Sequence, residues 1–306
     1  MVSRAEAKAA KKMTASHEEI ETPWTLMWKR YRKNKIAMSG LYIFGILLLF
    51  VILGPLVSPY DPNYMDYANT NVGPTISHLL GTDELGRDYL TRIMIGGRVS
   101  LMVGLFAVVI SIVFGALIGG IAGYYGGTID NLMMRLTEIV SSFPFLPLAI
   151  SVQAILGTRV PSEFKMYVTM MVIGLLSWPG LARMIRGQVL SLREMEFMSA
   201  AKALGLSDMR IVVRHLLPNT LAYIIVYATL GMAGAIMSES ALSFLGLGVT
   251  PPTPTWGNMI QYAKDMFVLK ARPWLWIPPG LCILLAVMSI NLIGDGLRDA
   301  FDPKSN

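Results

Sequence analysis

Six long stretches of the chain contain no Asp, Glu, Lys or Arg, and they limit the fold more than any other feature. A hydrocarbon core about 30 Å thick is crossed by roughly 20 apolar residues of an α-helix. The stretches are continuous rather than alternating, which excludes a membrane β-barrel. We therefore predict an all-α membrane protein with six transmembrane helices. The predicted spans cover about residues 36–57, 100–125, 137–157, 166–184, 219–242 and 274–296.

Two regions rich in proline complicate this pattern. A further uncharged run, residues 240–263, contains three prolines between Pro251 and Pro254 and several glycines, so we expect a loop or re-entrant segment there. Pro144, Pro147 and Pro179 fall in the third and fourth spans, where they permit kinks.

The charges give the orientation. Only 15% of the residues are charged, against about 25% in soluble domains, which argues against a soluble enzyme. With six spans, 18 of the 26 Lys and Arg residues fall on the side that holds both termini. Positive charge collects on the cytoplasmic side of membrane proteins, so both termini are predicted to be cytoplasmic. The net charge of +6 indicates contact with anionic lipid rather than nucleic acid.

The chain before the first span divides into two parts. Residues 1–22 are polar and are expected to form a mobile tail. From Pro23 to Lys35 aromatic and basic residues alternate, which is typical of an interfacial amphipathic helix and equally of a basic stop before a span. We therefore separate a cytoplasmic segment, residues 1–35, from a six-helix membrane domain, residues 36–306.

Glycines recur every four residues in the second span, at Gly115, Gly119, Gly123 and Gly127. In a helix they share one face and let a neighbouring helix approach closely. Helix packing is the favoured interpretation. A role in lining a substrate path and fraying of the helix end near Gly127 are the alternatives.

The outer segment between the first two spans ends in a turn-rich acidic motif. Thr82 is a candidate N-cap for a helix whose first turn carries Asp83 and Glu84. Asp83, Glu84 and Asp88 are also candidate contacts for a binding protein or a metal, although favourable charge at a helix N-terminus accounts for them more simply.

Glu239 is a carboxylate near the outer end of the fifth span. A carboxylate inside a membrane is a functional candidate by default. Glu239 is therefore predicted either to line the translocation path or take up a proton, or to hold the bend before Ser243.

The inner segment 185–218 carries the most specific pattern. Helix-forming residues run from Val189 to Leu204, Gly205 suits a left-handed helix cap, and Ser207 or Asp208 can start a second helix. We expect two short helices joined by a sharp turn, with Pro218 in the first turn of the next span.

This segment resembles the cytoplasmic loop of bacterial ABC importer permeases, whose pattern is Glu-Ala-Ala, three residues, Gly, nine residues, Ile, one residue, Leu-Pro. The spacing is intact, with Ser199 in place of the acidic residue and His215 in place of the apolar one, and Glu196 lies one turn before Ser199. Further motifs are similar to the C-type second permease subunit of the dipeptide and oligopeptide branch. They are residues 80–88, 123–127, 241–254 and 291–303.

The resemblance implies a type I importer bundle that moves peptides inward across the bacterial cytoplasmic membrane. It implies a second homologous permease subunit, two cytoplasmic ATPase subunits and an extracytoplasmic peptide-binding protein as partners. The residues expected to couple to the ATPase are Glu196, Ser199, Ala200, Ala201, Leu204 and Gly205. Nickel chelates or glutathione are alternative substrates of the same machinery.

The chain lacks the features of an enzyme. No Gly is followed by Lys, so no phosphate-binding loop of the G-x-x-x-x-G-K-[ST] type is present, and ATP hydrolysis is expected in separate subunits. Three widely separated histidines lack metal-ligand spacing, and no catalytic, metal or cofactor residues are predicted. Two rival hypotheses are a proton-coupled secondary transporter that uses Glu239 and a scaffold that only anchors other proteins.

Overall fold

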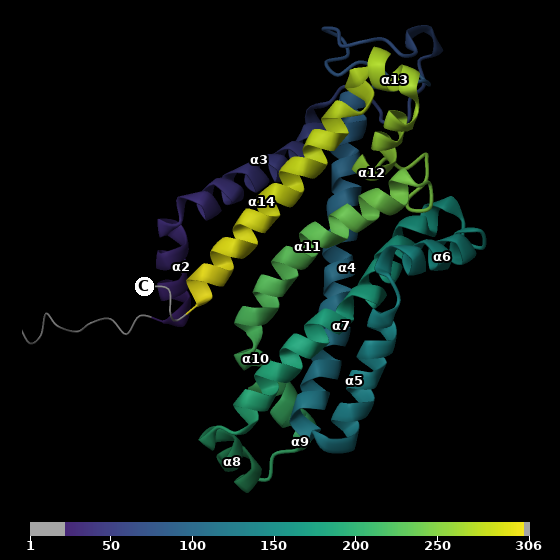
Figure 1. Cartoon of the computed structure of the whole chain (residues 1–306). Coiled ribbons are helices and arrows are strands. Elements are labelled where there is room, and N and C mark those ends of the chain that lie inside the picture. Colours follow the sequence, from purple (N-terminus) through teal and green to yellow (C-terminus); the bar gives the residue numbers. More distant parts are fainter. Residues whose placement is uncertain (1–21, 303–306) are drawn as a thin grey trace, which may run out of the picture.

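The computed structural model describes residues 22–302 and is built of helices and loops (Figure 1). In this part of the chain the one β-type pairing is an isolated bridge between Thr82 and Asp88. The expected tail, residues 1–22, lies outside the described residues except for Thr22. The Thr22 side chain accepts a hydrogen bond from the Thr25 backbone N–H and so caps α2 (Pro23–Lys33).

Five helices of the described chain are long and apolar enough to cross a membrane. They confirm the predicted all-α membrane class. The helices are α3 (Lys35–Val57), α4 (Tyr89–Tyr125), α7 (Lys165–Arg193), α11 (Leu221–Phe244) and α14 (Ile277–Phe301). Three of the five, α4, α7 and α14, extend beyond the predicted spans by three residues or more at one end, because a membrane helix continues into polar surroundings as long as its backbone stays paired.

The third predicted span, residues 137–157, is not a single helix. It falls on the end of α5 (Gly127–Ser142) and on α6 (Phe145–Gly157), which are bent by 83° relative to each other. Pro144 disfavours helical backbone at the residue before it, and Phe143 is extended, with φ −86° and ψ 133°. Counted as one span, the bent pair brings the total to six.

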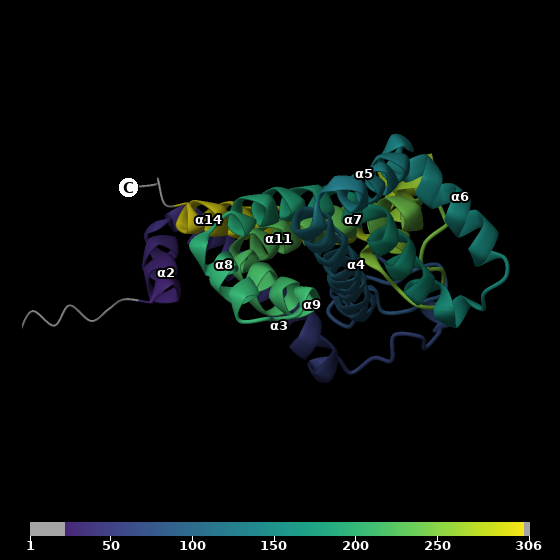
Figure 2. The same cartoon turned by 90° about the horizontal axis from the view of Figure 1, so that it is seen from below.

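The shorter elements gather at the two ends of the bundle. Both described chain ends and the segment after α7 lie on one side, and the segments before α4 and after α11 lie on the other (Figure 1), which Figure 2 shows from below. This arrangement fits the predicted common side for both termini. The shorter elements are η1 (Tyr67–Asn69), η2 (Ser162–Phe164), α8 (Glu196–Ala203), α9 (Asp208–Ile211), η3 (Val212–Leu216), α10 (Leu217–Asn219), α12 (Trp256–Met259), η4 (Ile260–Lys264), α13 (Met266–Ala271) and η5 (Pro273–Leu275).

The glycine row of α4 faces α7 at very short range. A Cβ added at Gly115 would lie 2.8 Å from Leu181 Cβ, and one at Gly119 would lie 2.3 Å from the Ala182 carbonyl oxygen. A Cβ at Gly123 would lie 2.9 Å from the Arg186 carbonyl oxygen. Real Cβ atoms essentially never approach a neighbour within 3.0 Å. The absence of side chains therefore sets the distance between α4 and α7. Gly127 lies beyond the end of α4.

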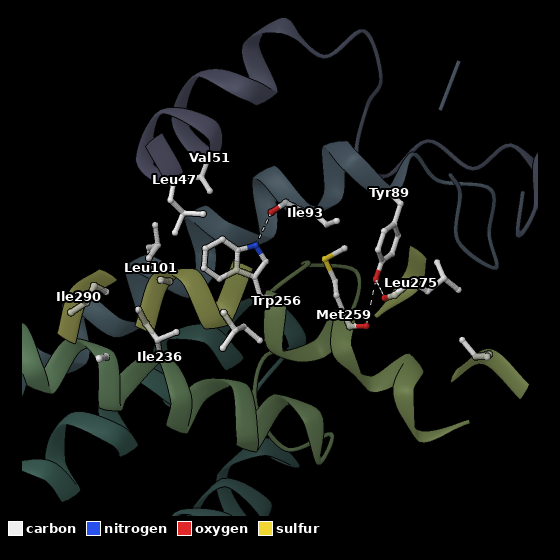
Figure 3. Packing of buried hydrophobic residues seen from close by; sticks show 14 residues of the cluster. Leu47, Val51, Tyr89, Ile93, Leu101, Ile236, Trp256, Met259, Leu275 and Ile290 are labelled. Atoms are coloured by element: carbon white, nitrogen blue, oxygen red, sulfur yellow. Dashed lines mark hydrogen bonds between the residues drawn. The ribbon is translucent and has the colours of Figure 1, made fainter. Parts of the chain in front are cut away.

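Trp256 anchors the outer segment to the bundle. Its indole ring is fully buried among α3, α4, α11 and α14, and its Nε1 donates to the Ile93 carbonyl oxygen at 3.0 Å (Figure 3). The hydroxyl of Tyr89, at the start of α4, donates to the Leu275 carbonyl oxygen in the same cluster. These bonds satisfy polar groups that would otherwise be buried without partners. The run after α11 is thus a packed cap over the bundle.

Arg98 compensates for a proline in the first span. Pro55 lies inside α3 and has no N–H to donate to the Val51 carbonyl four residues earlier. Arg98 of α4 donates there instead, with Nε 2.7 Å from the Val51 oxygen and Nη2 2.6 Å from the Ile52 oxygen. An unpaired backbone carbonyl in lipid costs several kcal/mol. The guanidinium of Arg98 therefore binds α3 to α4 at this level.

Helix α2 packs against the end of α14 through Tyr31, which clusters with Ala300, and through Trp24, whose ring meets that of Phe301 edge-on. Tyr31 is 2% exposed and donates to the Ala37 carbonyl oxygen, whereas Trp24 and Trp28 are about half exposed. Burial raises the pKa of Tyr31 above its ordinary value. Exposed tryptophans beside basic residues fit a helix lying at the membrane interface, and this placement of α2 stays a prediction.

Replacing Gly119 by Ala is expected to destabilise the protein by about 1–3 kcal/mol, because the added methyl group meets the Ala182 backbone and cannot be accommodated by a rotamer change. The matched control is Gly187→Ala in α7, where an added Cβ meets nothing within 4 Å. Thermal unfolding of the detergent-solubilised protein measures both. Equal melting temperatures for the two variants would contradict a contact set by glycine.

Candidate functional site

Helix α8 ends in a left-handed cap at Gly205. The backbone φ of Gly205 is +69°, as the sequence predicted, and the Leu206 N–H donates to the Ala201 carbonyl oxygen at 3.3 Å. This six-to-one bond pairs a carbonyl that the helix end leaves free. The prediction of one helix from Val189 to Leu204 is wrong, because α7 ends at Arg193 and the chain turns before α8 begins at Glu196. The break points α8 in a new direction.

Helix α8 has one face on the bundle and one face in the open. Met198 and Ala201 are buried in a cluster with residues of α7, α9 and η3. The other residues that the sequence assigned to ATPase coupling lie on the exposed face of this segment, which points away from the bundle. The structure therefore brings five of the six together on that face. They are Glu196, Ser199, Ala200, Leu204 and Gly205.

The exposed face of this segment, which points away from the bundle, is partly apolar. Phe197 is 37% exposed, Leu204 79% and Met209 52%, and all three lie beyond the ends of the long helices. Exposed apolar side chains next to small residues such as Ala200 are typical of a surface that another protein covers. This surface, which we call the α8 face, consists of Glu196, Phe197, Ser199, Ala200, Leu204, Gly205 and Met209.

Two polar contacts join the inner segment to the end of α4, and the sequence did not point to either. The Tyr124 hydroxyl donates to the Asp208 carboxylate at 2.6 Å. Arg193 Nη1 donates to the carbonyl oxygens of Gly123 at 3.4 Å and Tyr124 at 3.3 Å. A cation at the C-terminal end of a helix satisfies its free carbonyls and is favoured by the helix dipole. Both ends of the segment around α8 are thus attached to α4.

A buried turn connects the segment to the fifth span. Ile211, Val212 and Leu216 are almost fully buried in the cluster that also receives α8. The π-helical turn η3 and the short α10 carry the chain through Pro218 into α11. A displacement of α8 would therefore pass through this buried cluster to α4, α7 and α11.

A partly buried ion pair between Asp130 and Arg186 joins α5 to α7 close by. The Arg186 guanidinium contacts both carboxylate oxygens of Asp130 at 2.5 Å in a bidentate pair. Asp130 is 7% exposed. Bidentate pairing fixes the geometry as well as the charge. The sequence signal was two opposite charges at the inner ends of neighbouring spans, which by itself does not identify the partners.

Glu239 is fully buried among hydroxyl groups. Its carboxylate accepts hydrogen bonds from Ser100 of α4 at 3.1 Å and from Ser243 at 2.7 Å. Ser100 in turn accepts from the backbone N–H of Trp256 at 3.1 Å. The geometry favours the second alternative from the sequence, a carboxylate that holds the chain beyond the fifth span. A role in the translocation path stays a prediction.

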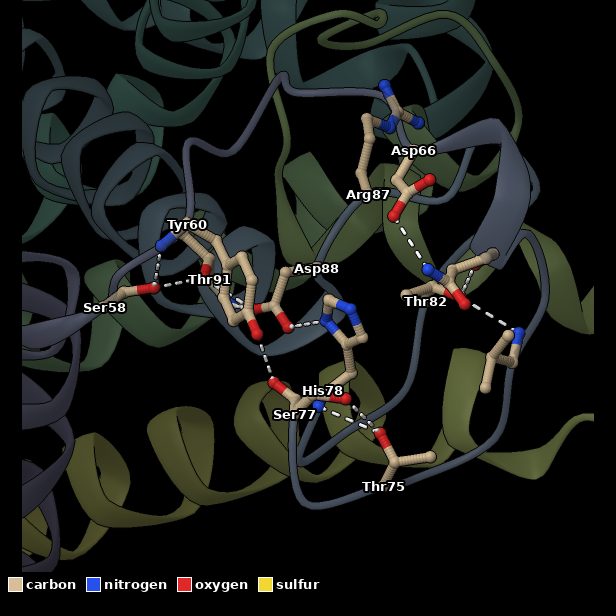
Figure 4. A network of polar contacts seen from close by, with 12 residues as sticks. Ser58, Tyr60, Asp66, Thr75, Ser77, His78, Thr82, Arg87, Asp88 and Thr91 are labelled. Carbon is tan, nitrogen blue, oxygen red and sulfur yellow. Dashed lines mark hydrogen bonds and ion pairs between the residues drawn. The ribbon is translucent and has the colours of Figure 1, made fainter.

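At the opposite end, the motif at residues 80–88 forms a buried turn and not a helix (Figure 4). The prediction that Thr82 caps a helix is wrong, because its hydroxyl donates to the Asn69 carbonyl oxygen. Asp88 caps α4 instead, accepting from the Thr91 backbone N–H at 2.8 Å, and its other oxygen contacts His78 Nδ1 at 2.9 Å. Thr82 and Asp88 are both residue types that are favoured at an N-cap. The tertiary structure determines which of the two caps a helix.

The other acidic residues of this outer region differ in whether a partner could reach them. Asp83 is buried and pairs with Arg87 at 2.7 Å, so it serves the turn itself, whereas Glu84 is exposed. Asp66 accepts hydrogen bonds from the Asn69 side chain and the Ala68 backbone N–H, which lower the pKa of its carboxyl. Of the three acidic candidates of the motif, only Glu84 is available to a partner.

The structure is thus a bundle of membrane-crossing helices with short helices, α8 among them, beyond its inner end. Residues 115–306 match the family described as the binding-protein-dependent transport system inner membrane component. Residues 22–74 match the N-terminal transmembrane domain of oligopeptide transport permease C.

Two relatives match along nearly their whole length. The chain is 44% identical over 283 residues to the dipeptide transport system permease protein DppC of Alkalihalophilus pseudofirmus, which is 92% of this chain and 90% of that protein. It is 41% identical over 288 residues to the glutathione transport system permease protein GsiD of Escherichia coli, 94% of this chain and 92% of that protein.

The chain therefore belongs to the family of inner membrane components of binding-protein-dependent transport systems, the ABC importer permeases. It is a multi-pass permease subunit of the bacterial inner membrane and not an enzyme. Permeases of this family work with separate ATPase subunits and with a binding protein.

Replacing Tyr124 by Phe is expected to loosen the segment after α8, because it removes the hydroxyl that donates to Asp208. One such hydrogen bond contributes about 1 kcal/mol, so amide hydrogen exchange across residues 206–211 should become about fivefold faster. Tyr167→Phe, an exposed tyrosine near the start of α7, is the matched control. Unchanged exchange in the Tyr124 variant would show that the bond does not hold the segment.

Proposed function

We propose that this permease imports short peptides in a complex with a second, homologous permease. The observation that supports the substrate class is the 44% identity to a dipeptide permease across 92% of the chain, together with the match of residues 22–74 to an oligopeptide permease domain. The 41% identity to a glutathione permease makes glutathione, itself a peptide, the second candidate.

We further propose that the α8 face docks on one ATPase subunit. The small side chains of Ser199 and Ala200 let a partner approach the helix closely, while Phe197 and Leu204 offer apolar area to bury. Each permease carries one such helix. Two permeases then match two ATPase subunits, and an extracytoplasmic protein delivers the peptide on the opposite side.

The contacts of α8 supply a route for the motion. When ATP draws the two ATPases together, α8 follows, and the buried Met198 and Ala201 transfer the displacement to α7 and η3. The Tyr124–Asp208 bond carries it to α4. Packed helices move as rigid bodies and shift between discrete arrangements, so the bundle alternates between openings to the two sides. This transport cycle requires closely packed helices and no reactive side chain.

Replacing Gly205 by Val is expected to abolish most peptide uptake while the permease still assembles. A β-branched residue at φ +69° costs about 1–3 kcal/mol, so the cap opens and the α8 face loses its shape. The matched control is Gly157→Val, where no positive φ is needed and an added Cβ meets nothing within 4 Å. Uptake of labelled dipeptide into cells, with pull-down of the ATPases, measures both.

The outcome separates the alternatives. Normal uptake in the Gly205 variant favours a scaffold or a mechanism that does not use α8. Uptake that persists without the ATPases and follows a pH gradient favours a proton-coupled transporter. Competition of dipeptide uptake by glutathione, compared with competition by unlabelled dipeptide, identifies which of the two peptides is carried.

A further inference from the structure

A groove of about 520 Å³ lies at the inner end of the bundle, between α2, the start of α11 and the end of α14. This end also holds both described chain ends (Figure 1). Arg30 is the one charged residue among the described residues that line the groove, and most of the others are apolar. We call it the α2 groove. Its wall includes Leu26, Arg30, Leu221, Ala222, Ala300 and Phe301.

A second hollow, of about 610 Å³, continues from the α2 groove along α11. The two share Ala222 and Phe301 in their walls. From Ala222 the wall of the second hollow proceeds through Val226 to Leu230, so its residues are spaced by about one helical turn. At about 1.5 Å per residue, these positions cover about 12 Å of the helix. The combined hollow therefore runs from the inner end of the bundle toward the middle of the fifth span.

Positive charge dominates the rim of the α2 groove. No Asp or Glu occurs between Thr22 and Lys35, whereas five exposed cations do, and Arg298 of α14 is exposed as well. Three exposed carboxylates at the end of α14 offset only part of this charge. The five cations are Lys29, Arg30, Arg32, Lys33 and Lys35, and the carboxylates are Asp295, Asp299 and Asp302. The rim therefore favours an anionic ligand.

The level of the groove matches the boundary between lipid headgroups and hydrocarbon. Trp24, on the groove wall, is 51% exposed and meets the ring of Phe301 edge-on, and tryptophan is enriched at this boundary. Arg30 Nη1 donates to the Asp302 carbonyl oxygen at 3.0 Å. That acceptor is uncharged, so the guanidinium keeps its charge, and four of its five N–H donors remain outside this bond.

We propose that the α2 groove binds one anionic phospholipid of the inner leaflet. Its phosphate contacts the Arg30 guanidinium, whose planar fork suits phosphate oxygens, and one acyl chain lies along Ala222, Val226 and Leu230. A cluster of basic residues on an amphipathic helix beside a span is the pattern that attracts anionic lipid. A soluble phosphate would use Arg30 alone and leave the apolar wall open to water. The bound lipid joins α2 to the start of α11, where the segment after α8 ends.

The experiment uses the complete transporter, reconstituted into phosphatidylcholine vesicles. Bromine atoms on acyl chains quench the fluorescence of a tryptophan that they contact, and subtracting the signal of the Trp24→Phe variant isolates the contribution of Trp24. Quenching by brominated phosphatidylglycerol is compared with quenching by brominated phosphatidylcholine at the same mole fraction. The ratio gives the preference of the groove for the anionic lipid, whichever peptide the permease carries.

Arg30→Gln and Arg32→Gln remove the same charge from the same helix. Residues two positions apart point about 160° away from each other, and Arg32 is not among the residues that line the groove. We expect the unsubstituted protein and Arg32→Gln to prefer phosphatidylglycerol about fivefold, and Arg30→Gln to show no preference. An equal loss in both variants would show diffuse attraction of anionic lipid to α2 and would overturn the proposed site.

A second variant, Ala222→Phe, leaves every charge in place and fills the junction of the two hollows. It should lose the preference as Arg30→Gln does, with assembly of the complex checked by gel filtration. The matched control is Met237→Phe, at an exposed position of α11 that lines neither hollow. A preference that survives Ala222→Phe would show that no acyl chain enters. Trp24 fluorescence that neither lipid quenches would show that a protein subunit covers the groove. Either result overturns the proposal, and if Ala222→Phe does not assemble, the two arginine variants decide.

Discussion

The close approach of α4 and α7 is the contact on which the rest of the permease depends. At Gly119 the gap is too narrow for a methyl group, so the two helices cannot slide or rotate independently without a clash. Helix α4 also contributes to the buried clusters at the outer end, the middle and the inner end of the bundle. Because α7 leads directly to α8, the position of the α8 face follows from this contact.

Much of the architecture was predictable from the distribution of charge, because a helix in lipid needs a long uncharged sequence and few other sequences satisfy that need. The break at Phe143 and Pro144 was not predictable from the sequence. A proline inside a membrane helix is compatible with a gentle kink, a full break or a straight helix, depending on how neighbouring groups pair the freed carbonyls. Pro55 and Pro144 show two of these outcomes in one chain, a continuous helix and an 83° bend.

The candidate site also has features that could be predicted from the sequence and features that could not. The cap at Gly205 was predictable because a local turn needs a positive φ that few residues other than glycine adopt. The contacts that hold it, Tyr124 to Asp208 and Arg193 to the end of α4, join residues 69 to 84 positions apart. Their chemistry is common to many other pairs in the chain, so only the packed structure selects them.

The pairing of Arg98 with the carbonyls beside Pro55 has a consequence for how the permease changes shape. The guanidinium of Arg98 fixes two backbone carbonyls of α3 to α4. The outer third of the first span therefore moves together with α4. Both acceptors are uncharged carbonyls, so the guanidinium keeps its positive charge there. In an alternating bundle, the first span would then move with α4 at its outer end, whereas its inner half packs against α14, where a Cβ added at Gly40 would lie 2.9 Å from the Ser289 carbonyl oxygen.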